Sequence, residues 1–232
     1  MAGRIKGLLF DKDGTLYDFH GTWARWCVDL LEDLTGGDTP HMARLADALR
    51  FDLATERYHP ESPVIAGTPD QAVTAMLPHM PGWTAPTLRA HIIEASNHAP
   101  LAEAVPLADL LTGLKAQGYI LGVSTNDAEK PARRQLQQSG VLEAFDFVAG
   151  YDTGYGAKPG HGMQTGFCAE TGLSGAEVAI VGDSRHELDA GRAAGMAPVA
   201  VLTGPAPRAA LAPHAAAVLD TIGDLPAWLA TR

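Results

Sequence analysis

The sequence is poor in cysteine and lysine and has no long apolar run. These features exclude several classes of protein. Its only cysteines, Cys27 and Cys168, lie far apart and outside any CxxC or Cys/His spacing. They suit packed thiols in a reducing compartment better than a disulfide framework. No hydrophobic stretch approaches a membrane span, and the apolar run near the N-terminus stops at Asp11, too soon for a signal peptide. We therefore expect a cytoplasmic protein with no membrane partner.

Basic residues are also in the minority. The chain has 17 Lys+Arg against 27 Asp+Glu, a formal net charge of -10, and the basic residues form no run. A negative body repels phosphate polymers, so we expect no nucleic-acid partner. A small anionic substrate stays compatible with this charge, because one divalent cation and one lysine reverse the potential inside a cleft. With 46% hydrophobic residues the chain can bury a proper core.

Short apolar runs that end in turn residues recur along most of the chain. The first is Ile5 to Phe10, and others cover residues 119–124, 145–149, 178–181, 198–202 and, more weakly, 215–219. Segments with helical spacing separate them, at residues 107–117, 129–139, 163–171, 186–194 and 222–230. Strands that alternate with helices indicate βαβ units. We predict an α/β fold, a Rossmann-like doubly wound parallel sheet.

Residues 20–100 break this rhythm. They contain no convincing strand run, and turn-forming stretches divide them into about four helices. Their apolar residues recur at helical spacing: Trp23, Trp26, Cys27, Leu30, Leu31 and Leu34. We predict that residues 1–19 and 101–232 form the core and that residues 20–100 form a helical cap inserted after the first strand. Such an insert would lie above the carboxyl ends of the strands, where ligands bind in open α/β folds.

Two carboxylates, Asp11 and Asp13, directly follow the first apolar run. An ionised carboxylate is a hard oxygen ligand suited to Mg²⁺, and it can attack phosphorus to give an aspartyl-phosphate. The second carboxylate can protonate the leaving alcohol and then accept a proton from the attacking water. A calcium loop is a competing interpretation, but Gly14 comes too early for that pattern and a strand precedes it. An acidic turn that caps the strand is the other alternative.

Two sites after later apolar runs can contribute phosphate-binding groups. Ser124-Thr125-Asn126 offers hydroxyl, amide and backbone N–H groups, although Asn126 and Asp127 suit a helix cap equally well. Lys158 would supply a point charge that offsets the nucleophile and the transferring oxygens. A solvated loop lysine is the alternative, but lysine is scarce, with five in the chain.

A third site, Gly182 to Glu187, adds two more carboxylates. Asp183 follows the apolar run 178–181 and would be a further oxygen ligand for Mg²⁺. Two interpretations of Glu187 stay open at this point. It can hold a metal-bound water, or it can form a capping box with Ser184 that needs no metal.

The ordered set of motifs resembles the haloacid dehalogenase superfamily, in particular its phosphoglycolate phosphatase-like branch with a helical cap. The resemblance covers the whole chain, and the matching motifs are Asp11-Lys12-Asp13-Gly14-Thr15-Leu16, Thr125-Asn126, Lys158-Pro159 and Gly182-Asp183-Ser184. It implies a Mg²⁺-dependent phosphoric monoester hydrolase. Two positions depart from the family pattern: Glu187 stands where Asp is common, which affects metal affinity, and His161 stands where proline is frequent, which affects the rigidity of that loop.

The resemblance also implies a role for each matching residue. Asp11 is the nucleophile and Asp13 the general acid/base. Thr125 and Asn126 bind the phosphoryl group, and Lys158 steadies the nucleophile. The expected metal ligands are Asp11, Asp13 through its backbone carbonyl, and Asp183. The expected binding partner is a small phosphorylated metabolite, with 2-phosphoglycolate or a related compound as the best candidate. We expect the chain to be a monomer or a homodimer.

Residues also separate this expectation from its rivals. Dehalogenases of the superfamily lack an acid at the position of Asp13, and phosphonoacetaldehyde hydrolases need a cap lysine for a Schiff base, which residues 20–100 do not contain. A sugar-phosphate mutase stays open, because it would share the core. A non-catalytic phosphate-binding module would have lost Asp11, Asp13 or Lys158. In the cap, Arg57 or His59 can bind a substrate carboxylate. The alternative is that Arg57 is simply solvated and that His59 is a turn residue.

Overall fold

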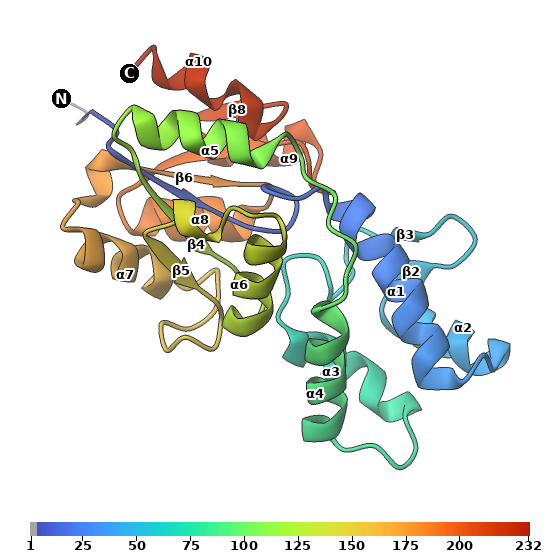
Figure 1. The fold of residues 1–232 in the computed structure, drawn as a ribbon. Coiled ribbons are helices and arrows are strands. Elements are labelled where there is room, and N and C mark those ends of the chain that lie inside the picture. Colours follow the sequence, from blue (N-terminus) through green and yellow to red (C-terminus); the bar gives the residue numbers. More distant parts are fainter. Residues whose placement is uncertain (1–3) are drawn as a thin grey trace. The chain divides into compact units, whose positions relative to one another are not determined.

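The computed structural model describes residues 4–232, which fall into two compact units (Figure 1). Unit 1 contains the chain up to Phe19 and from Ala102 to Arg232, and unit 2 contains His20 to Leu101. Among the described residues, no helix has both the length and the apolar character needed to cross a membrane. The sequence indicated boundaries at residues 19/20 and 100/101; that unit 2 acts as a cap stays a prediction.

Unit 1 is built on a six-stranded sheet in the order β5-β4-β1-β6-β7-β8. Every pairing in it is parallel, so the predicted α/β fold with a parallel sheet is confirmed. β1 lies between β4 and β6, and Leu8 is opposite both Leu121 and Ala179. The strands are β1 (Gly7–Phe10), β4 (Ile120–Ser124), β5 (Phe147–Ala149), β6 (Val178–Gly182), β7 (Ala197–Val201) and β8 (Ala217–Leu219).

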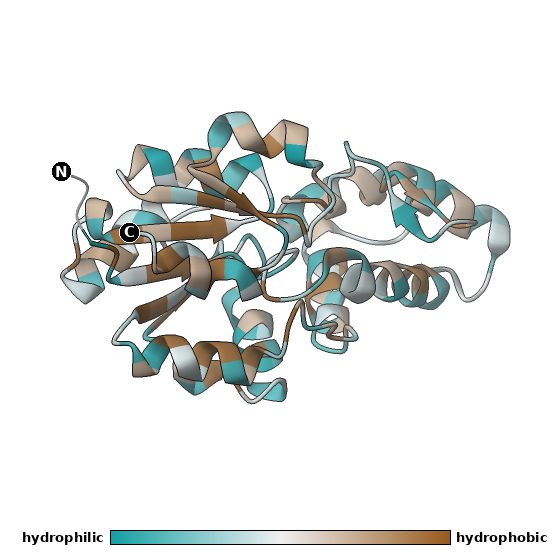
Figure 2. Ribbon diagram, turned by 90° about the horizontal axis from the view of Figure 1, so that it is seen from above, coloured by the Kyte–Doolittle hydropathy of each residue, from teal (hydrophilic) through white to brown (hydrophobic). Residues whose placement is uncertain are grey.

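Helices lie against this sheet in Figure 1, and Figure 2 shows hydrophobic strands with more polar helix surfaces around them. All residues of β1 and β6 are buried, as expected for strands covered on both faces. α7 packs against β4 and β5, and α8 packs against β6 and β7. The helices of unit 1 are α5 (Leu107–Ala116), α6 (Glu129–Gln138), α7 (Gly162–Thr171), α8 (Arg185–Ala193), α9 (Arg208–Leu211) and α10 (Leu225–Leu229).

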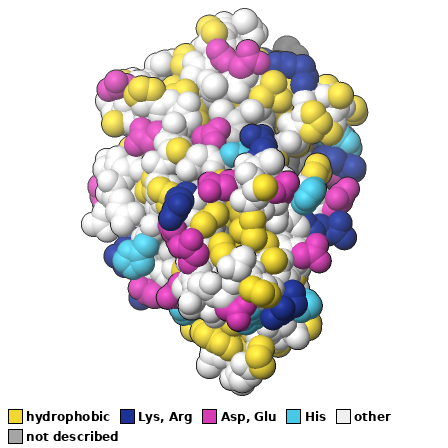
Figure 3. All heavy atoms as spheres, turned by 90° about the vertical axis from the view of Figure 1, so that its right-hand side faces the viewer, with side chains coloured by type: hydrophobic (Ala, Val, Ile, Leu, Met, Phe, Trp, Pro, Cys, Tyr) yellow, Lys and Arg dark blue, Asp and Glu magenta, His cyan; other side chains and the backbone are white. Residues whose placement is uncertain are grey.

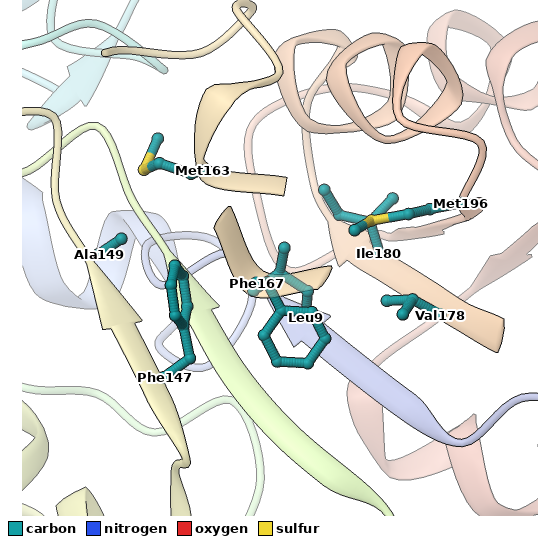
Figure 4. Close-up of a cluster of buried hydrophobic side chains, with 8 residues drawn as sticks. All are labelled: Leu9, Phe147, Ala149, Met163, Phe167, Val178, Ile180 and Met196. Atoms are coloured by element: carbon teal, nitrogen blue, oxygen red, sulfur yellow. The ribbon is translucent and has the colours of Figure 1, made fainter. Parts of the chain in front are cut away.

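A cluster of buried hydrophobic side chains joins α7 to the sheet (Figure 4). α7 contributes Met163 and Phe167, which are four residues apart and so point from the same side of the helix. The strands and the segment before β7 contribute Leu9, Phe147, Ala149, Val178, Ile180 and Met196. This packing fixes β1, β5 and β6 relative to each other, and so fixes the loops that leave their carboxyl ends.

Unit 2 is mainly helical, with α1 (Phe19–Thr35) starting at the last residue of unit 1, then α2 (Thr39–Ala48), α3 (Pro69–Met76) and α4 (Ala85–Ser96). Trp23 and Trp26 are buried and meet edge to face with ring centroids 4.8 Å apart, so they belong to the core of unit 2. The sequence indicated no strand here, but β2 (Phe51–Asp52) and β3 (Arg57–Tyr58) form an antiparallel pair. Two-residue strands are too short to show a period of two, so the pattern missed them.

The face in Figure 3 carries acidic, basic and hydrophobic side chains interspersed with one another. This mixture fits the sequence, in which the basic residues form no run. Basic residues that are interspersed with acidic ones do not make the positive stripe that characterises nucleic-acid binding.

Candidate active site

The carboxyl ends of three neighbouring strands bring the predicted site residues together in unit 1. Asp11 directly follows β1, Ser124 ends β4, and Asp183 directly follows β6. Because β1 pairs with both β4 and β6, these positions share one edge of the sheet. The chain order runs from β1 outward through β4 and β5, and then from β6 outward through β7 and β8. The site therefore lies at the point where the strand order reverses, which is where open α/β sheets bind ligands.

Lys158 is the centre of this site. Its Nζ donates a hydrogen bond to Asp11 Oδ1 at 2.6 Å and to the Ser124 carbonyl oxygen at 2.9 Å. The same Nζ lies 2.8 Å from Glu187 Oε1. Lys158, Asp11 and Glu187 are 4%, 6% and 2% exposed. A buried ammonium with three oxygen partners is held in one place, and it fixes the orientation of the Asp11 carboxylate.

Asn126 has a function that the sequence did not indicate. Its Oδ1 accepts a hydrogen bond from the Lys158 backbone N–H at 2.8 Å, and its Nδ2 donates to the Lys158 carbonyl oxygen at 3.0 Å. Both ends of the buried amide are thus engaged with one residue, and the side chain holds the Lys158 loop beside Asp11. The neighbouring Thr125 is buried, and its Oγ1 accepts from the backbone N–H of Asp127 at 3.0 Å. Phosphoryl binding by Thr125 and Asn126 stays a prediction.

Three buried carboxylates, Asp11, Asp183 and Glu187, form an acidic cluster with ligand oxygens within 4.8 Å of one another. Two glycines make room for it. A Cβ on Gly14 would lie 2.5 Å from Asp183 Oδ2, and a Cβ on Gly204 would overlap the same carboxylate. Gly14 also has a φ of 79°, in the left-handed region that favours glycine. Gly204 is a site residue that sequence reasoning missed, because it lies outside the four motifs.

The crowding of these carboxylates shifts their titration. Burial raises the pKa of Asp11 to about 7, with Glu187 and Asp13 adding to the rise and Lys158 opposing it. Burial, Glu187 and Asp11 hold the pKa of Asp183 well above its usual range. Burial would lower the pKa of Lys158, but Asp11 and Glu187 outweigh it and raise that pKa. When all three carboxylates are ionised, their charge exceeds that of the one ammonium, and a bound cation would favour that state.

Glu187 forms the capping box that was one of its two predicted roles, and it makes a further contact that was not predicted. Its Oε2 accepts hydrogen bonds from the Ser184 backbone N–H at 3.1 Å and from the Ser184 hydroxyl, so the capping box of α8 is present. Its other oxygen, Oε1, pairs with Lys158. This ion pair keeps the pKa of Glu187 below its usual value despite burial. Glu187 is therefore both a helix cap and a partner of Lys158.

A second buried lysine, Lys12, lies beside Asp13. Lys12 is fully buried, and its Nζ donates to Asp13 Oδ1 at 2.7 Å and to Gln135 Oε1 at 2.6 Å. Asp127 Oδ2 is 3.5 Å from the same Nζ. Burial raises the pKa of Asp127 to about 6. Lys12 is part of the first sequence motif, but no role was predicted for it.

The two residues proposed for substrate choice belong to unit 2. Arg57 lies in β3, and His59 directly follows it. Both side chains are exposed, whereas Tyr58 between them is buried. This alternation is what a short strand with one covered face produces. Their contribution to substrate binding stays a prediction.

A parallel α/β sheet with buried carboxylates and a lysine at its carboxyl edge is typical of enzymes that bind ligands at the strand ends. The family model described as haloacid dehalogenase-like hydrolase matches residues 8–201. The chain therefore belongs to the haloacid dehalogenase-like hydrolase family. This match contains all four motifs that carried the resemblance.

The relatives that the chain resembles in sequence bear phosphatase names. It is 29% identical over 211 residues to the probable phosphatase IndB of Dickeya dadantii (strain 3937), with 85% of this chain and 81% of the relative covered. It is 28% identical over 213 residues to a phosphoglycolate phosphatase of Chromobacterium violaceum, with 85% of each chain covered. These relatives support the predicted enzyme class, a phosphoric monoester hydrolase of the phosphoglycolate phosphatase-like branch.

Solved structures with the same fold include phosphatases and mutases. A predicted phosphoglycolate phosphatase from Haemophilus somnus 129pt superposes with a TM-score of 0.72 at 21% identity, covering 98% of this chain and 99% of the other. A β-phosphoglucomutase from Clostridium difficile superposes with a TM-score of 0.64 at 17% identity, covering 95% and 93%. At these identities the likeness concerns the fold alone.

Proposed function

We propose that the protein is a Mg²⁺-dependent phosphatase that hydrolyses a small phosphate monoester through an aspartyl-phosphate on Asp11. The observation that carries this proposal is the buried contact between Lys158 Nζ and Asp11 Oδ1 at 2.6 Å, next to the carboxylate of Asp183. A carboxylate nucleophile needs a fixed orientation and a nearby cation to approach an anionic phosphate. Asp11 has both.

The first step uses Asp11 and Asp13. With Oδ1 of Asp11 held by Lys158, its other oxygen attacks phosphorus, and the bond from phosphorus to the ester oxygen breaks. Asp13 gives a proton to the departing alcohol. In the second step Asp13 takes a proton from water, which attacks the aspartyl-phosphate and releases inorganic phosphate. Thr125 and Asn126 are proposed to bind the phosphoryl oxygens; because both ends of the Asn126 side-chain amide hold Lys158, we assign its part to the backbone N–H.

The acidic cluster fits Mg²⁺ in its donor chemistry. Its donors are carboxylate oxygens, the ligands that this hard cation prefers, and its three carboxylates exceed the one ammonium of Lys158. Asp11 and Asp183 would hold the ion together with the backbone carbonyl of Asp13. Glu187 is engaged with Ser184 and Lys158, so we assign it an orienting role. When bound, Mg²⁺ neutralises charge on the phosphoryl oxygens and orients them.

The proposed substrate is 2-phosphoglycolate or a related small phosphometabolite. The names of several relatives support it, and Arg57 or His59 would bind the substrate carboxylate. A sugar-phosphate mutase is the alternative and would use the same core. The two differ in whether the phosphoryl group passes to water or to a sugar hydroxyl. A cytoplasmic location and a monomeric or homodimeric state stay predictions.

Release of inorganic phosphate from a panel of small phosphate esters tests this proposal. The panel contains 2-phosphoglycolate and several sugar phosphates, each assayed with Mg²⁺ and with a chelator. We expect metal-dependent release that Asp11→Asn abolishes, with the ranking of esters naming the substrate class. No release from any ester by folded, metal-loaded protein would contradict the proposal. Transfer to a sugar phosphate in place of release would favour the mutase.

A further inference from the structure

We infer that Lys12 is a positioning residue for the proton transfer: it holds the carboxylate of Asp13 where that group can reach the leaving oxygen. This inference rests on the proposed function, because it concerns the general acid/base of that reaction. It assigns a role to a buried cation that the proposed chemistry leaves without one. Lys12 makes no contact with the reacting atoms in this assignment and acts through Asp13 alone.

The position of the Lys12 ammonium is fixed from several elements. Gln135 of α6 accepts a hydrogen bond at 2.6 Å, and Asp127, in the loop between β4 and α6, lies 3.5 Å away. The ring of Tyr17 lies beneath it, with its centroid 5.9 Å from Nζ. The Tyr17 hydroxyl in turn donates to Ser139 Oγ at 2.9 Å. The ammonium is thus a fixed point that joins the loop after β1 to α6 and to the loop before α6.

Asp13 needs such a fixed point more than its neighbours do. Asp11 directly follows a buried strand and is held by Lys158, whereas Asp13 lies two residues farther out, and 18% of its side chain is exposed. Its contact with Lys12 Nζ at 2.7 Å uses Oδ1. A carboxylate held at one oxygen presents the other in a defined direction, and Oδ2 is then the atom that carries the proton. General acid catalysis depends on that geometry.

A purely structural role is the competing explanation. Lys12 would then neutralise Asp13 and Asp127 inside the fold, and its removal would lower stability and slow every substrate alike. The positioning role makes a different prediction, because the need for a general acid depends on the leaving group. An alkoxide must be protonated as it departs, whereas p-nitrophenolate leaves without a proton. The two roles therefore separate on the substrate dependence of kcat/KM, which covers the steps up to departure of the leaving group.

The experiment compares Lys12→Met with wild type on the best alkyl ester of the panel and on p-nitrophenyl phosphate. For the alkyl ester we expect kcat/KM to fall about 10²-fold, the lower end of what general acid catalysis contributes. For the aryl ester we expect a fall of less than about threefold. Lys115→Met is the matched control, because Lys115 is a half-exposed lysine that pairs with Asp146; neither substrate should respond to it.

Two further variants keep the result decisive. Lys12→Met with Asp127→Asn removes one buried charge of each sign, so it tests the same point in a protein with unchanged net charge if the single variant does not fold.

In an Asp13→Asn background, Lys12→Met should add less than about twofold to the loss for the alkyl ester, because both substitutions act through one group. Equal losses on both esters, or full additivity with Asp13→Asn, would overturn the inference. Absence of phosphate release by wild type would instead refute the proposed function itself.

Discussion

Two clusters around buried lysines, built from similar groups, differ in their charge balance. We call them the Lys158 cluster (Lys158, Asp11, Asp183 and Glu187) and the Lys12 cluster (Lys12, Asp13, Asp127 and Gln135). The Lys158 cluster has three carboxylates around one ammonium. The Lys12 cluster has two carboxylates and a neutral amide around one ammonium. Ion pairs raise the pKa of both lysines, so both carry a full charge in the folded protein.

The difference in charge balance suits the two clusters to different tasks. Excess negative charge in a buried place is unfavourable unless a cation joins it, so the Lys158 cluster is suited to a metal ion, and only with that ion bound would it accept an anionic substrate. The Lys12 cluster is closer to neutral and satisfies its ammonium with the neutral oxygen of Gln135 as well as with carboxylates. It is suited to fixing a position. Asp11 and Asp13, two residues apart, each belong to one of these clusters.

Breaking the Lys158 cluster should have the largest effect. Lys158→Met leaves Asp11 and Glu187 buried without their cation, which should cost about 3–5 kcal/mol of unfolding free energy. We expect phosphate release to fall about 10³-fold, since a fixed cation beside the transferring group is lost. Lys130→Met, at an exposed lysine of α6, is the control. Phosphate release within tenfold of wild type would mean that Lys158 is structural only.

Crowding the metal side of the cluster should have the next largest effect. In Gly204→Ala the new Cβ overlaps the Asp183 carboxylate, which must leave its present position in the acidic cluster. We expect the Mg²⁺ concentration for half-maximal activity to rise about 10–100-fold, the range found when groups that orient metal ligands are changed. Gly172→Ala offers a comparison at a glycine with nothing near its Cβ position. It should lower stability through its positive φ without changing the metal requirement.

The pH dependence of stability should sharpen the comparison between the clusters. The pKa of Asp11 is raised to about 7 in the folded protein, and in the unfolded chain it is ordinary. The folded state therefore binds the extra proton between about pH 4 and 7, and metal-free protein loses stability as pH rises through this range. Mg²⁺ binds the ionised form, so it should stabilise more at pH 8 than at pH 5.

Thermal unfolding in chelator and in Mg²⁺ across this pH range measures the effect, at about 2–4 °C for each kcal/mol in a chain of this size. Asp11→Asn should remove part of the pH dependence that is seen in chelator. The result would count against the assignment if Mg²⁺ stabilised the protein equally at both pH values, or if Asp11→Asn left the profile unchanged.

The smallest effect should come from unit 2. Arg57→Ala should raise KM for 2-phosphoglycolate by about tenfold or less, the value of one exposed charge contact, while kcat stays unchanged. A phosphate ester without a carboxylate should not respond, and that difference is the measurement. Arg25→Ala is a suitable control, because Arg25 is an exposed residue of α1 that pairs with Asp29. An equal rise in KM for both esters would show that Arg57 does not bind the substrate carboxylate.

The sequence allowed the sheet to be predicted because its strands are covered on both faces and read as continuous apolar runs, as at β1 and β6. Site residues that directly follow such strands, Asp11 and Asp183, could be predicted for the same reason. Contacts between distant parts of the chain could not be predicted. The ion pair of Glu187 with Lys158 joins helix α8 to the loop before α7, and the hydrogen bonds of Asn126 join the loop after β4 to that same loop. No local period in the sequence records which distant segments meet, so those contacts appeared only in the structure.

The central place of β1 has a consequence for how the chain is made. The strand that precedes Asp11 is synthesised before both of its partners, β4 and β6, which come much later in the sequence. Pairings between segments so far apart form slowly, because the entropy cost of closing a long loop comes before any stabilising contact forms. A chain emerging from the ribosome therefore carries an apolar strand whose second edge stays unpaired until β6 follows. Asp11 can meet Lys158 and Asp183 only after the segments that carry those residues have been synthesised, so the acidic cluster forms late.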